Sequence, residues 1–313
     1  MFDLTPIFIM GAPRSGTTML ANMLASNPDS IALPEMHYIH NLLEKELLYG
    51  QLSSDCIVKV LKQNFMFVDL NIISSDDDFD ILLGDSIKDV LNKILALYNI
   101  KYFKKSYRFW IEHTPHNHKY FNVLSTQYSN AKFIHIVRDG RAVYYSTKET
   151  DCGYKDIVLG ARRWRENVLD CLILDKIFPN KVITVKYENL VTQTERTLRS
   201  ICDFVGMKYL DTMIGGKGII LPSFSKYSKD AGSKPNTNSL DKWQRSLKEF
   251  EIKHFNAVNQ DVLNLLNYDV NSYDCKELIG IKKILIRIIG YLKMKCSTKS
   301  AQNRFNSVFN ENN

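Results

Sequence analysis

The stretch "PIFIMGAPRSGTTMLANML" at residues 6–24 decides the predicted fold. Its first five residues are apolar and predict a buried strand. After the loop "GAPRSG", the apolar residues fall on one face of a helix: Met19, Leu20, Met23 and Leu24. In a strand, loop and helix unit, backbone N–H groups and the positive end of the helix dipole converge on one point. The stretch therefore predicts an anion site.

This loop differs from the triphosphate-binding motif Gly-x-x-x-x-Gly-Lys-Ser/Thr, because Thr17 stands where that motif has its lysine. In that motif the lysine reaches the outer phosphates of a nucleoside triphosphate. The cation here is Arg14, inside the loop, where it is expected to face the near end of a bound anion. The sequence therefore predicts a phosphate-binding loop whose ligand is not ATP.

Short apolar runs alternate with helical patterns along most of the chain, which is typical of an α/β fold with a parallel sheet covered by helices. Strands are predicted near residues 6–11, 30–33, 108–112, 131–137 and 181–186. Helical spacing covers residues 157–172 and 198–205, and Gly206 is expected to end the second helix. We therefore predict a P-loop-like sheet of about five strands flanked by helices.

Two regions fall outside this alternation. Residues 50–107 are expected to form a helical insertion in which two helices flank "SSDDDFD", an acidic stretch that we interpret as a solvated loop. In residues 276–313, "LIGIKKILIRIIGYLKMK" predicts a basic amphipathic helix followed by a frayed tail. The predicted domains are thus 1–275, which contains the insertion, and 276–313.

The positive charge is concentrated in this tail. The net charge is +7, and the residues after position 275 hold eight Lys and Arg residues against two glutamates. The rest of the chain is nearly neutral, which argues against nucleic acid as a partner and leaves room for a local anion pocket.

Cysteine usage and hydropathy point to an ordinary soluble globular protein. The six cysteines lie far apart, with no Cys-x-x-Cys pair and no His/Cys cluster at zinc-ligand spacing, so we expect reduced thiols and no metal. No apolar run reaches the roughly 18 residues that span a bilayer, and no signal peptide is visible. A cytoplasmic location is therefore expected.

The segments "PRSGTT" and "VRDGRAVYYS" (137–146) resemble the PAPS-dependent sulfotransferases, particularly the tyrosylprotein-type and related bacterial branches. PAPS is 3'-phosphoadenosine 5'-phosphosulfate. Four more segments are similar to the family, in the same order: "LPEMH" (33–37), "EHTP" (112–115), "VKYENL" (185–190) and "SKPNTNSLDKW" (233–243). The resemblance implies transfer of a sulfuryl group from PAPS to a hydroxyl, in line and without a metal.

The resemblance also implies two anion sites, because PAPS carries a 5'-phosphosulfate and a separate 3'-phosphate. The residues implied for the 5' end are Arg14, Ser15, Gly16, Thr17 and Thr18. Arg138 and Ser146 are implied for the 3'-phosphate, since a guanidinium offers a bidentate fork to phosphate oxygens. An ion pair with Asp139 is the alternative for Arg138. Further implied donor contacts are Tyr187, Ser225, Lys226 and Lys234.

For the general base, the resemblance implies Glu35, which matches the catalytic glutamate of the family in "LPEMH". It follows the short second strand, where parallel-sheet enzymes place functional residues. His37 is the alternative base. The other reading of Glu35 is a carboxylate near the start of a helix, stabilised by the helix dipole.

His113 marks a departure from the family, because many relatives carry a lysine at this place in an "EKTP"-like segment. Histidine has a reference pKa of about 6.5, so its charged form would need stabilisation by the anions of the donor. We predict that His113 is protonated in the donor complex and stabilises the leaving oxygen. His116, His118 and Lys119 stay open for this role.

The remaining histidines are expected to be structural: His40 on a helix, His135 inside an apolar strand and His254 on a polar helix face.

Two other functions stay open. One is a P-loop kinase or nucleotide hydrolase, for which Asp139 is the only candidate magnesium ligand. The other is a catalytically silent nucleotide-binding scaffold. The acceptor hydroxyl belongs to a peptide tyrosine, a carbohydrate or a small molecule. For residues 278–295 the alternatives are an apolar face docked on the domain and contact with a membrane surface, and a homodimer also stays open.

Overall fold

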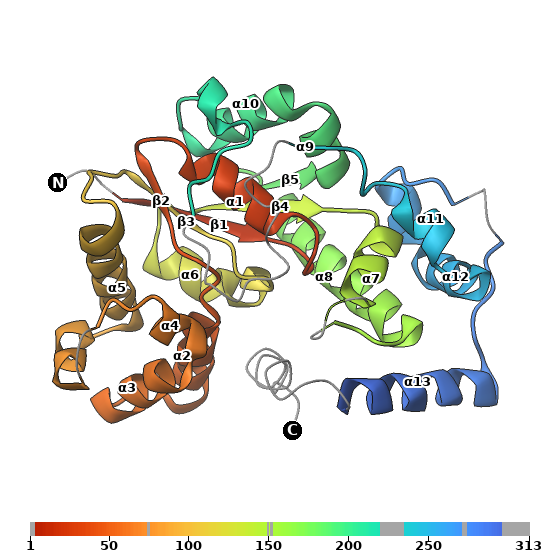
Figure 1. Cartoon of the computed structure of the whole chain (residues 1–313), viewed down its shortest axis with the longest axis horizontal. Helices are drawn as coiled ribbons and strands as arrows, with labels where there is room; N and C mark the ends of the chain where they lie inside the picture. The colour runs from red at the N-terminus through yellow and green to blue at the C-terminus, as the bar shows by residue number, and fades with distance from the viewer. Residues whose placement is uncertain are drawn as a thin grey trace. The chain divides into compact units, whose positions relative to one another are not determined.

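The computed structural model describes residues 4–73, 76–148, 150, 153–219, 235–270 and 274–295. The strands are β1 (Thr5–Met10), β2 (Ser30–Ala32), β3 (Phe109–Glu112), β4 (Lys132–Val137) and β5 (Val182–Lys186). They form a five-stranded sheet in the order β2-β3-β1-β4-β5, and β3 runs parallel to both β1 and β2 (Figure 1). All five predicted strands are confirmed to within one residue at each end.

The contacts divide the chain into two compact units. The first is made of residues 1–10, 17–134 and 198–234, and the second of residues 11–16, 135–197 and 235–313. Besides strands, the first unit holds α1 (Thr17–Ala25), α2 (His37–Tyr49), α3 (Ser54–Gln63), α4 (Phe65–Asp69), η1 (Asp76–Leu82), α5 (Ile87–Tyr102), η2 (Asn117–Tyr120), α6 (Phe121–Gln127), most of α10 (Thr194–Val205) and η3 (Asp211–Met213). The second holds α7 (Gly140–Lys148), α8 (Ile157–Ile177), α9 (Tyr187–Thr192), α11 (Lys242–Ser246), α12 (Glu249–Leu265) and α13 (Gly280–Lys295).

Aromatic side chains fill the core of the first unit around β1. Phe8 is almost fully buried, and its ring stacks on Phe133 with 5.2 Å between centroids. The ring of Trp110 in β3 meets the ring of Phe8 edge-on, with 5.6 Å between centroids. Such pairs add to the stabilisation that burial of apolar area provides. The loop that follows β1 therefore starts from a rigid strand.

The insertion contains more structure than the sequence predicts. It holds α3, α4 and α5, and residues 76–82 form the 3-10 helix η1. The interpretation of the acidic stretch as a loop is wrong from residue 76 onward, where the 3-10 helix begins; Phe79 is buried with its ring centroid 6.1 Å from that of Phe67, while Asp80 is exposed. An apolar anchor inside an acidic segment is enough to order it against the neighbouring helix.

The second unit has its own core, in which Trp164 of α8 packs on Phe255 of α12 with 5.4 Å between ring centroids. Helix α8 extends the predicted helix, and its N-cap is Asp156, whose side chain accepts the N–H of Leu159 at 2.8 Å. The predicted stop of α10 is also confirmed, since Gly206 has a φ of 73° just beyond the last helical residue.

Two of the three histidines expected to be structural lie where the sequence predicts. His40 is buried in α2 and His135 is buried in β4. His254 is structural as expected, since it accepts the N–H of Leu278 at 3.1 Å, but its expected place on a polar helix face is wrong, because the side chain is buried in α12.

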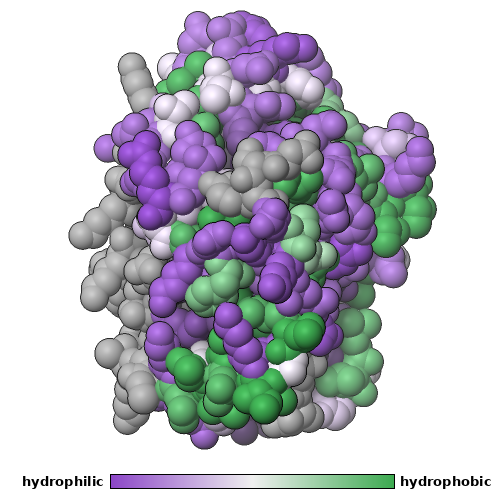
Figure 2. Space-filling model, turned by 90° about the vertical axis from the view of Figure 1, so that its right-hand side faces the viewer, coloured by the Kyte–Doolittle hydropathy of each residue, from purple (hydrophilic) through white to green (hydrophobic). Residues whose placement is uncertain are grey.

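The predicted basic helix near the C-terminus is confirmed as α13, but its apolar face is not docked on the domain. Side chains such as Ile281 and Ile284 are exposed. Helix α13 lies near the bottom of Figure 1, and Figure 2 shows apolar surface (green) near the bottom of the molecule. Over the described ranges, no helix combines the length and apolarity needed to cross a membrane. The described cysteines are free thiols: Cys56, Cys171, Cys202 and Cys275.

Candidate active site

The loop between β1 and α1 has a strained and closely packed backbone. Arg14 has a φ of 71°, which is uncommon for a residue with a side chain, and Gly16 has a φ of 101°. A Cβ atom on Gly16 would lie 2.6 Å from a ring carbon of Tyr187. Glycine is therefore required at this position both for its φ and for the close approach of the tyrosine ring.

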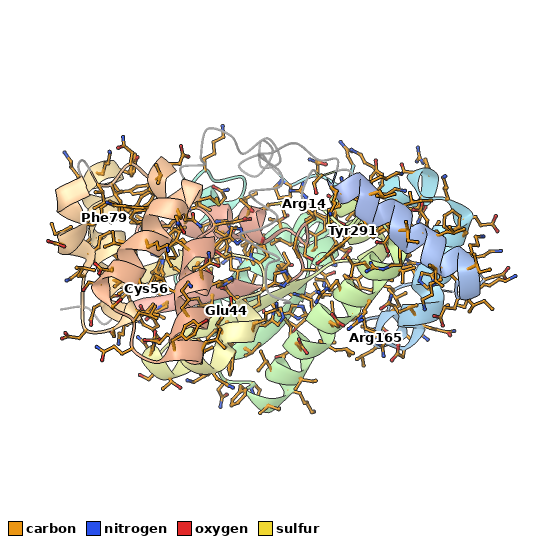
Figure 3. All side chains as sticks on the ribbon, turned by 90° about the horizontal axis from the view of Figure 1, so that it is seen from below. Arg14, Glu44, Cys56, Phe79, Arg165 and Tyr291 are labelled. Atoms are coloured by element: carbon orange, nitrogen blue, oxygen red, sulfur yellow. The ribbon has the colours of Figure 1, made fainter. Side chains whose placement is uncertain are left out.

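The side chains predicted to bind the donor's phosphates meet in the second unit. Arg14 donates its Nε–H to the hydroxyl of Ser146 at 3.1 Å (Arg14 is labelled in Figure 3). Arg138 donates through Nη1 to the carbonyl of Arg14 at 3.1 Å and through Nη2 to the carbonyl of Ser239 at 2.9 Å. The guanidinium of Arg138 lies 4.4 Å from the ring centroid of Tyr187. The loop and the strand-helix unit, which the sequence assigns to separate anions, are thus in direct contact.

Arg138 has no acidic partner in the part of the chain that the structure describes. Its side chain is buried, and the Nε–H makes no hydrogen bond within these residues. The predicted alternative, an ion pair with Asp139, is wrong because Asp139 pairs with Arg141 at 2.7 Å. A buried cation held only by carbonyl oxygens and an aromatic ring is suited to an anionic ligand.

The same pairing bears on the kinase alternative. Asp139 Oδ1 accepts the backbone N–H and the Nε–H of Arg141 at 2.9 and 3.0 Å, and Oδ2 accepts from Nη2. Both oxygens of the candidate magnesium ligand are therefore engaged by one arginine. The role of Asp139 is to hold the start of α7, the helix that carries Ser146.

Ser239 is a site residue that sequence reasoning missed. Besides its carbonyl contact with Arg138, its hydroxyl lies 3.1 Å from the hydroxyl of Tyr187. The segment "SKPNTNSLDKW" contains it, so the signal was present, but nothing in the segment singles out this serine from its polar neighbours.

The other loop residues lie where strand and helix meet. Ser15 is buried and donates its N–H to the carbonyl of Ala12 at 3.1 Å. Thr17 and Thr18 open α1, and Thr17 is buried. Three predicted donor contacts lie outside the described residues: Ser225, Lys226 and Lys234.

In the first unit, a buried carboxylate organises the segment that follows β3. Glu112 Oε1 accepts the N–H of Thr114 at 2.9 Å and also its hydroxyl, while Oε2 accepts from the amide of Asn117. The amide oxygen of Asn117 lies 2.8 Å from Nε2 of His40. Glu112 is 3% exposed and both of its oxygens accept hydrogen bonds from neighbouring residues, so they serve the fold. The segment "EHTP" contains Glu112, but no sequence pattern singles out Glu112 or Asn117 for this network.

This network reaches the predicted catalytic segment through one hydroxyl. Thr114 Oγ1 accepts the N–H of Met36 at 2.6 Å, next to Glu35 in the chain. Glu35 Oε2 lies 3.2 Å from Nε2 of His37. The side chain of Glu35 is 30% exposed and that of His37 is 12% exposed. The two candidate bases are therefore in contact, and the carboxylate is the more accessible of the two.

His113 is 1% exposed, and neither ring nitrogen has a hydrogen-bond partner among the described residues. Two of its three alternatives are weakened by their surroundings. Burial, aided by the charge of Lys119, lowers the pKa of His118 to about 3. Burial and the neighbouring His118 also lower the pKa of His116. Both are therefore neutral near pH 7 and supply no cation there.

Comparison with known proteins identifies the family. A family model described as "Sulfotransferase family" matches residues 6–211. The chain is 26% identical to protein-tyrosine sulfotransferase 1 of Danio rerio over 284 residues, which cover 85% of this chain and 73% of that protein. It is 27% identical to protein-tyrosine sulfotransferase 1 of Homo sapiens over 282 residues, with 85% and 70% covered.

Solved structures confirm the predicted fold class. The sulfotransferase domain from the Synechococcus PCC 7002 olefin synthase superposes with a TM-score of 0.58 at 22% identity, covering 86% of this chain and 97% of that domain. The sulfotransferase domain from the curacin biosynthetic pathway gives a TM-score of 0.56 at 19% identity, covering 85% and 98%. At these identities the likeness establishes the α/β architecture and nothing finer.

Proposed function

The chain belongs to the sulfotransferase family, and we propose that it transfers a sulfuryl group from PAPS to a hydroxyl. The observation that carries the choice of donor is the cluster of Arg14, Ser146, Arg138 and Tyr187. It joins two guanidinium groups, a hydroxyl and an aromatic ring, and it leaves the buried Nε–H of Arg138 without a partner among the described residues. Such a cluster suits a nucleotide that carries phosphate at two positions.

In this proposal each part of the cluster binds one end of the donor. Arg138 and Ser146 bind the 3'-phosphate, with Tyr187 beside them. The residues that bind the 5'-phosphosulfate are Arg14, Ser15, Gly16, Thr17 and Thr18. Backbone N–H groups at the start of α1 and the helix dipole favour negative charge at this end. Ser225, Lys226 and Lys234 are further proposed donor contacts.

The transfer is an in-line displacement at sulfur. A bond forms between the acceptor oxygen and sulfur while the bond from sulfur to the bridging oxygen of the 5'-phosphate breaks, and that oxygen keeps the electron pair. The hydroxyl proton passes to Glu35. Arg14 and a protonated His113 stabilise the charge that develops on the leaving oxygen. The reaction written in this way uses no metal.

The choice of Glu35 as base follows from the burial of the carboxylates at this place. Glu112 is buried, and both of its oxygens accept hydrogen bonds within the fold, from Thr114 and Asn117. Glu35 is partly exposed, and its contact with His37 fixes one oxygen. We propose that His37 orients the carboxylate, and that His37 takes over as base only if Glu35 proves dispensable.

Titration calorimetry tests the donor proposal. We compare 3'-phosphoadenosine 5'-phosphate, the desulfated donor, with AMP in the presence of a chelator. The desulfated donor should bind on the order of a hundredfold more tightly, because only it carries the 3'-phosphate. Arg138→Gln should remove most of this difference and leave the affinity for AMP unchanged. Equal affinities for both nucleotides in the wild-type protein would rule out the 3'-phosphate site.

The acceptor requires a separate experiment. The names of the curated relatives support a peptide tyrosine as the first class to test, ahead of carbohydrates and small molecules. Incubation with sulfur-labelled PAPS and fractionated acceptors should label one class. Binding of the desulfated donor without transfer to any fraction would favour the catalytically silent scaffold. Magnesium-dependent hydrolysis of ATP would favour the kinase or hydrolase alternative.

A further inference from the structure

Helix α13 presents a continuous apolar face to solvent. The residues of this face recur at spacings of three and four, as one side of a helix requires: Ile281, Ile284, Leu285, Ile288 and Leu292. Each of them is at least 49% exposed, and Ile281 reaches 76%. At 1.5 Å per residue, a helix of this length is about 24 Å long. An apolar strip of this extent is unusual on a surface that stays in water.

The opposite side of α13 fixes the helix to its own unit. A Cβ atom on Gly290 would lie 2.7 Å from side-chain atoms of Asp156, so only glycine allows this approach to the start of α8. Arg287 forms an ion pair with the same aspartate at 3.0 Å. Ile286 packs against the core of the unit. The close approach at Gly290 and the ion pair of Arg287 with Asp156 hold the inner side of the helix against its unit. The large apolar side chains on the other side therefore point outward.

Further contacts at the first turns support the same orientation. The N–H of Leu278, just before the helix, is accepted by the buried His254. The ammonium of Lys282 lies 5.2 Å from the ring centroid of Phe250. Lys283 pairs with Glu277 at 2.8 Å.

Lysines border the apolar face. Lys and Arg occupy five positions of α13, and no acidic residue occurs in it. By the helical repeat, Lys282 and Lys293 lie on one flank of the face and Lys295 lies beside its last turn. Lys283 and Arg287 lie toward the inner side, where they pair with Glu277 and Asp156. Tyr291, which is labelled in Figure 3, lies at the edge of this face and is half exposed. This is the pattern of a helix that lies in the interface of a membrane with its apolar side among the acyl chains.

We propose that α13 docks this face on an anionic lipid surface. The charge distribution favours lipid headgroups over a second copy of the chain, because two α13 helices packed face to face would bring their lysines (Lys282, Lys293 and Lys295) together. Anionic headgroups instead attract each lysine and arginine near the surface. The helix then anchors the enzyme on a membrane without crossing it, and the proposal holds whatever the acceptor is.

Vesicle flotation of the full-length protein tests this proposal. Phosphatidylcholine vesicles are compared with vesicles that contain about 30% phosphatidylserine, a content that makes the surface strongly anionic. The protein should float with the anionic vesicles and bind neutral ones at least about tenfold more weakly. Raising the salt concentration should weaken the binding, because the electrostatic part is screened.

Two double variants distinguish vesicle binding by α13 from vesicle binding by other exposed apolar side chains. Ile284→Ser with Ile288→Ser removes apolar area from the proposed face and should lower the partition coefficient on anionic vesicles about tenfold or more. The matched control is Ile173→Ser with Ile177→Ser on α8, where both side chains are also at least 54% exposed and one helical turn apart. The control should bind as the wild type does.

Three results would overturn the proposal. The first is no flotation with anionic vesicles. The second is equal binding by the α13 variant and the wild type. The third is a concentration-dependent dimer in analytical ultracentrifugation that the α13 variant abolishes, together with no vesicle binding, which would assign the face to a second copy.

Discussion

At the scale of single residues, burial decides what chemically identical groups do. Glu35 and Glu112 are both glutamates beside strand ends, yet Glu112 is 3% exposed and hydrogen-bonded while the Glu35 side chain is 30% exposed. Arg138 and Arg141 are both buried and differ in their partners instead, since among the described residues only Arg141 of the two pairs with a carboxylate. Residue type alone predicts neither difference, because each depends on which neighbours the fold supplies.

Glu35→Gln should lower the rate of sulfuryl transfer by about a hundredfold or more, because the amide cannot accept the proton of the acceptor. The affinity for the desulfated donor should stay unchanged. Single-turnover transfer and calorimetry measure the two quantities, and Glu44→Gln on the following helix is the control. A Glu35→Gln protein that transfers at the wild-type rate would move the role of base to His37.

His113→Lys should retain activity and flatten its decline at alkaline pH. A lysine keeps its charge over an alkaline range in which an imidazole is neutral. The pH profile of kcat gives the answer, and a thermal melt checks that the buried lysine is tolerated. An inactive but folded His113→Lys protein contradicts the proposed role.

At the scale of elements, two short segments outside the helices and strands position groups of the candidate site. The turn after β3 carries Thr114, whose hydroxyl joins Glu112 to the backbone of Met36. The loop before α1 carries Gly16, which allows the ring of Tyr187 to approach. Both segments act by geometry, so their variants should affect one function each.

Thr114→Val should lower kcat with no change in affinity for the desulfated donor, because the Met36 N–H loses its partner and the segment of Glu35 loses its support. The unpaired buried groups should also lower the free energy of unfolding by about 1–3 kcal/mol. Thr114→Ser keeps the hydroxyl and should restore kcat. If Thr114→Val and Thr114→Ser have equal kcat values, the hydroxyl does not position Glu35.

Gly16→Ala should abolish binding of the desulfated donor, because its Cβ would collide with Tyr187 and its φ of 101° is unfavourable for alanine. Gly206→Ala is a matched control: Gly206 also has a positive φ, but a Cβ atom there meets nothing within 4 Å. The control should cost about 1 kcal/mol of stability and leave binding intact. Thermal shift with the nucleotide compares the two, and normal binding by a folded Gly16→Ala protein would contradict the prediction.

At the scale of the whole molecule, the proposed roles divide between the two compact units. Arg14, Arg138, Ser146 and Tyr187, which we assign to the donor, belong to the second unit. Glu35 and His113, which we assign to the chemistry of transfer, belong to the first. We therefore expect variants of the first group to change the affinity for the donor and variants of the second group to change the rate of transfer.

The stability of the molecule should fall as the pH is lowered from about 6.5 to 4. Burial lowers the pKa of His40 to about 4, and that of His118 to about 3, so the unfolded chain binds more protons than the folded one in this range. His40→Gln should make the drop in the free energy of unfolding between pH 7.5 and pH 5 smaller, by an amount on the order of 1 kcal/mol. Urea unfolding at pH 5 and 7.5 measures it, and identical losses in both proteins would show that His40 is not the cause.

The sequence by itself determined the five strands, the loop after β1, the stop at Gly206 and the presence of a basic amphipathic helix, because each depends on local periodicity or on one residue's backbone preference. Only the tertiary structure decided that Arg138 pairs with no described carboxylate, that Glu112 is buried, that residues 76–82 are ordered around Phe79, and that α13 turns its apolar face outward. These facts depend on contacts between residues far apart in the chain, and local patterns carry no record of such contacts.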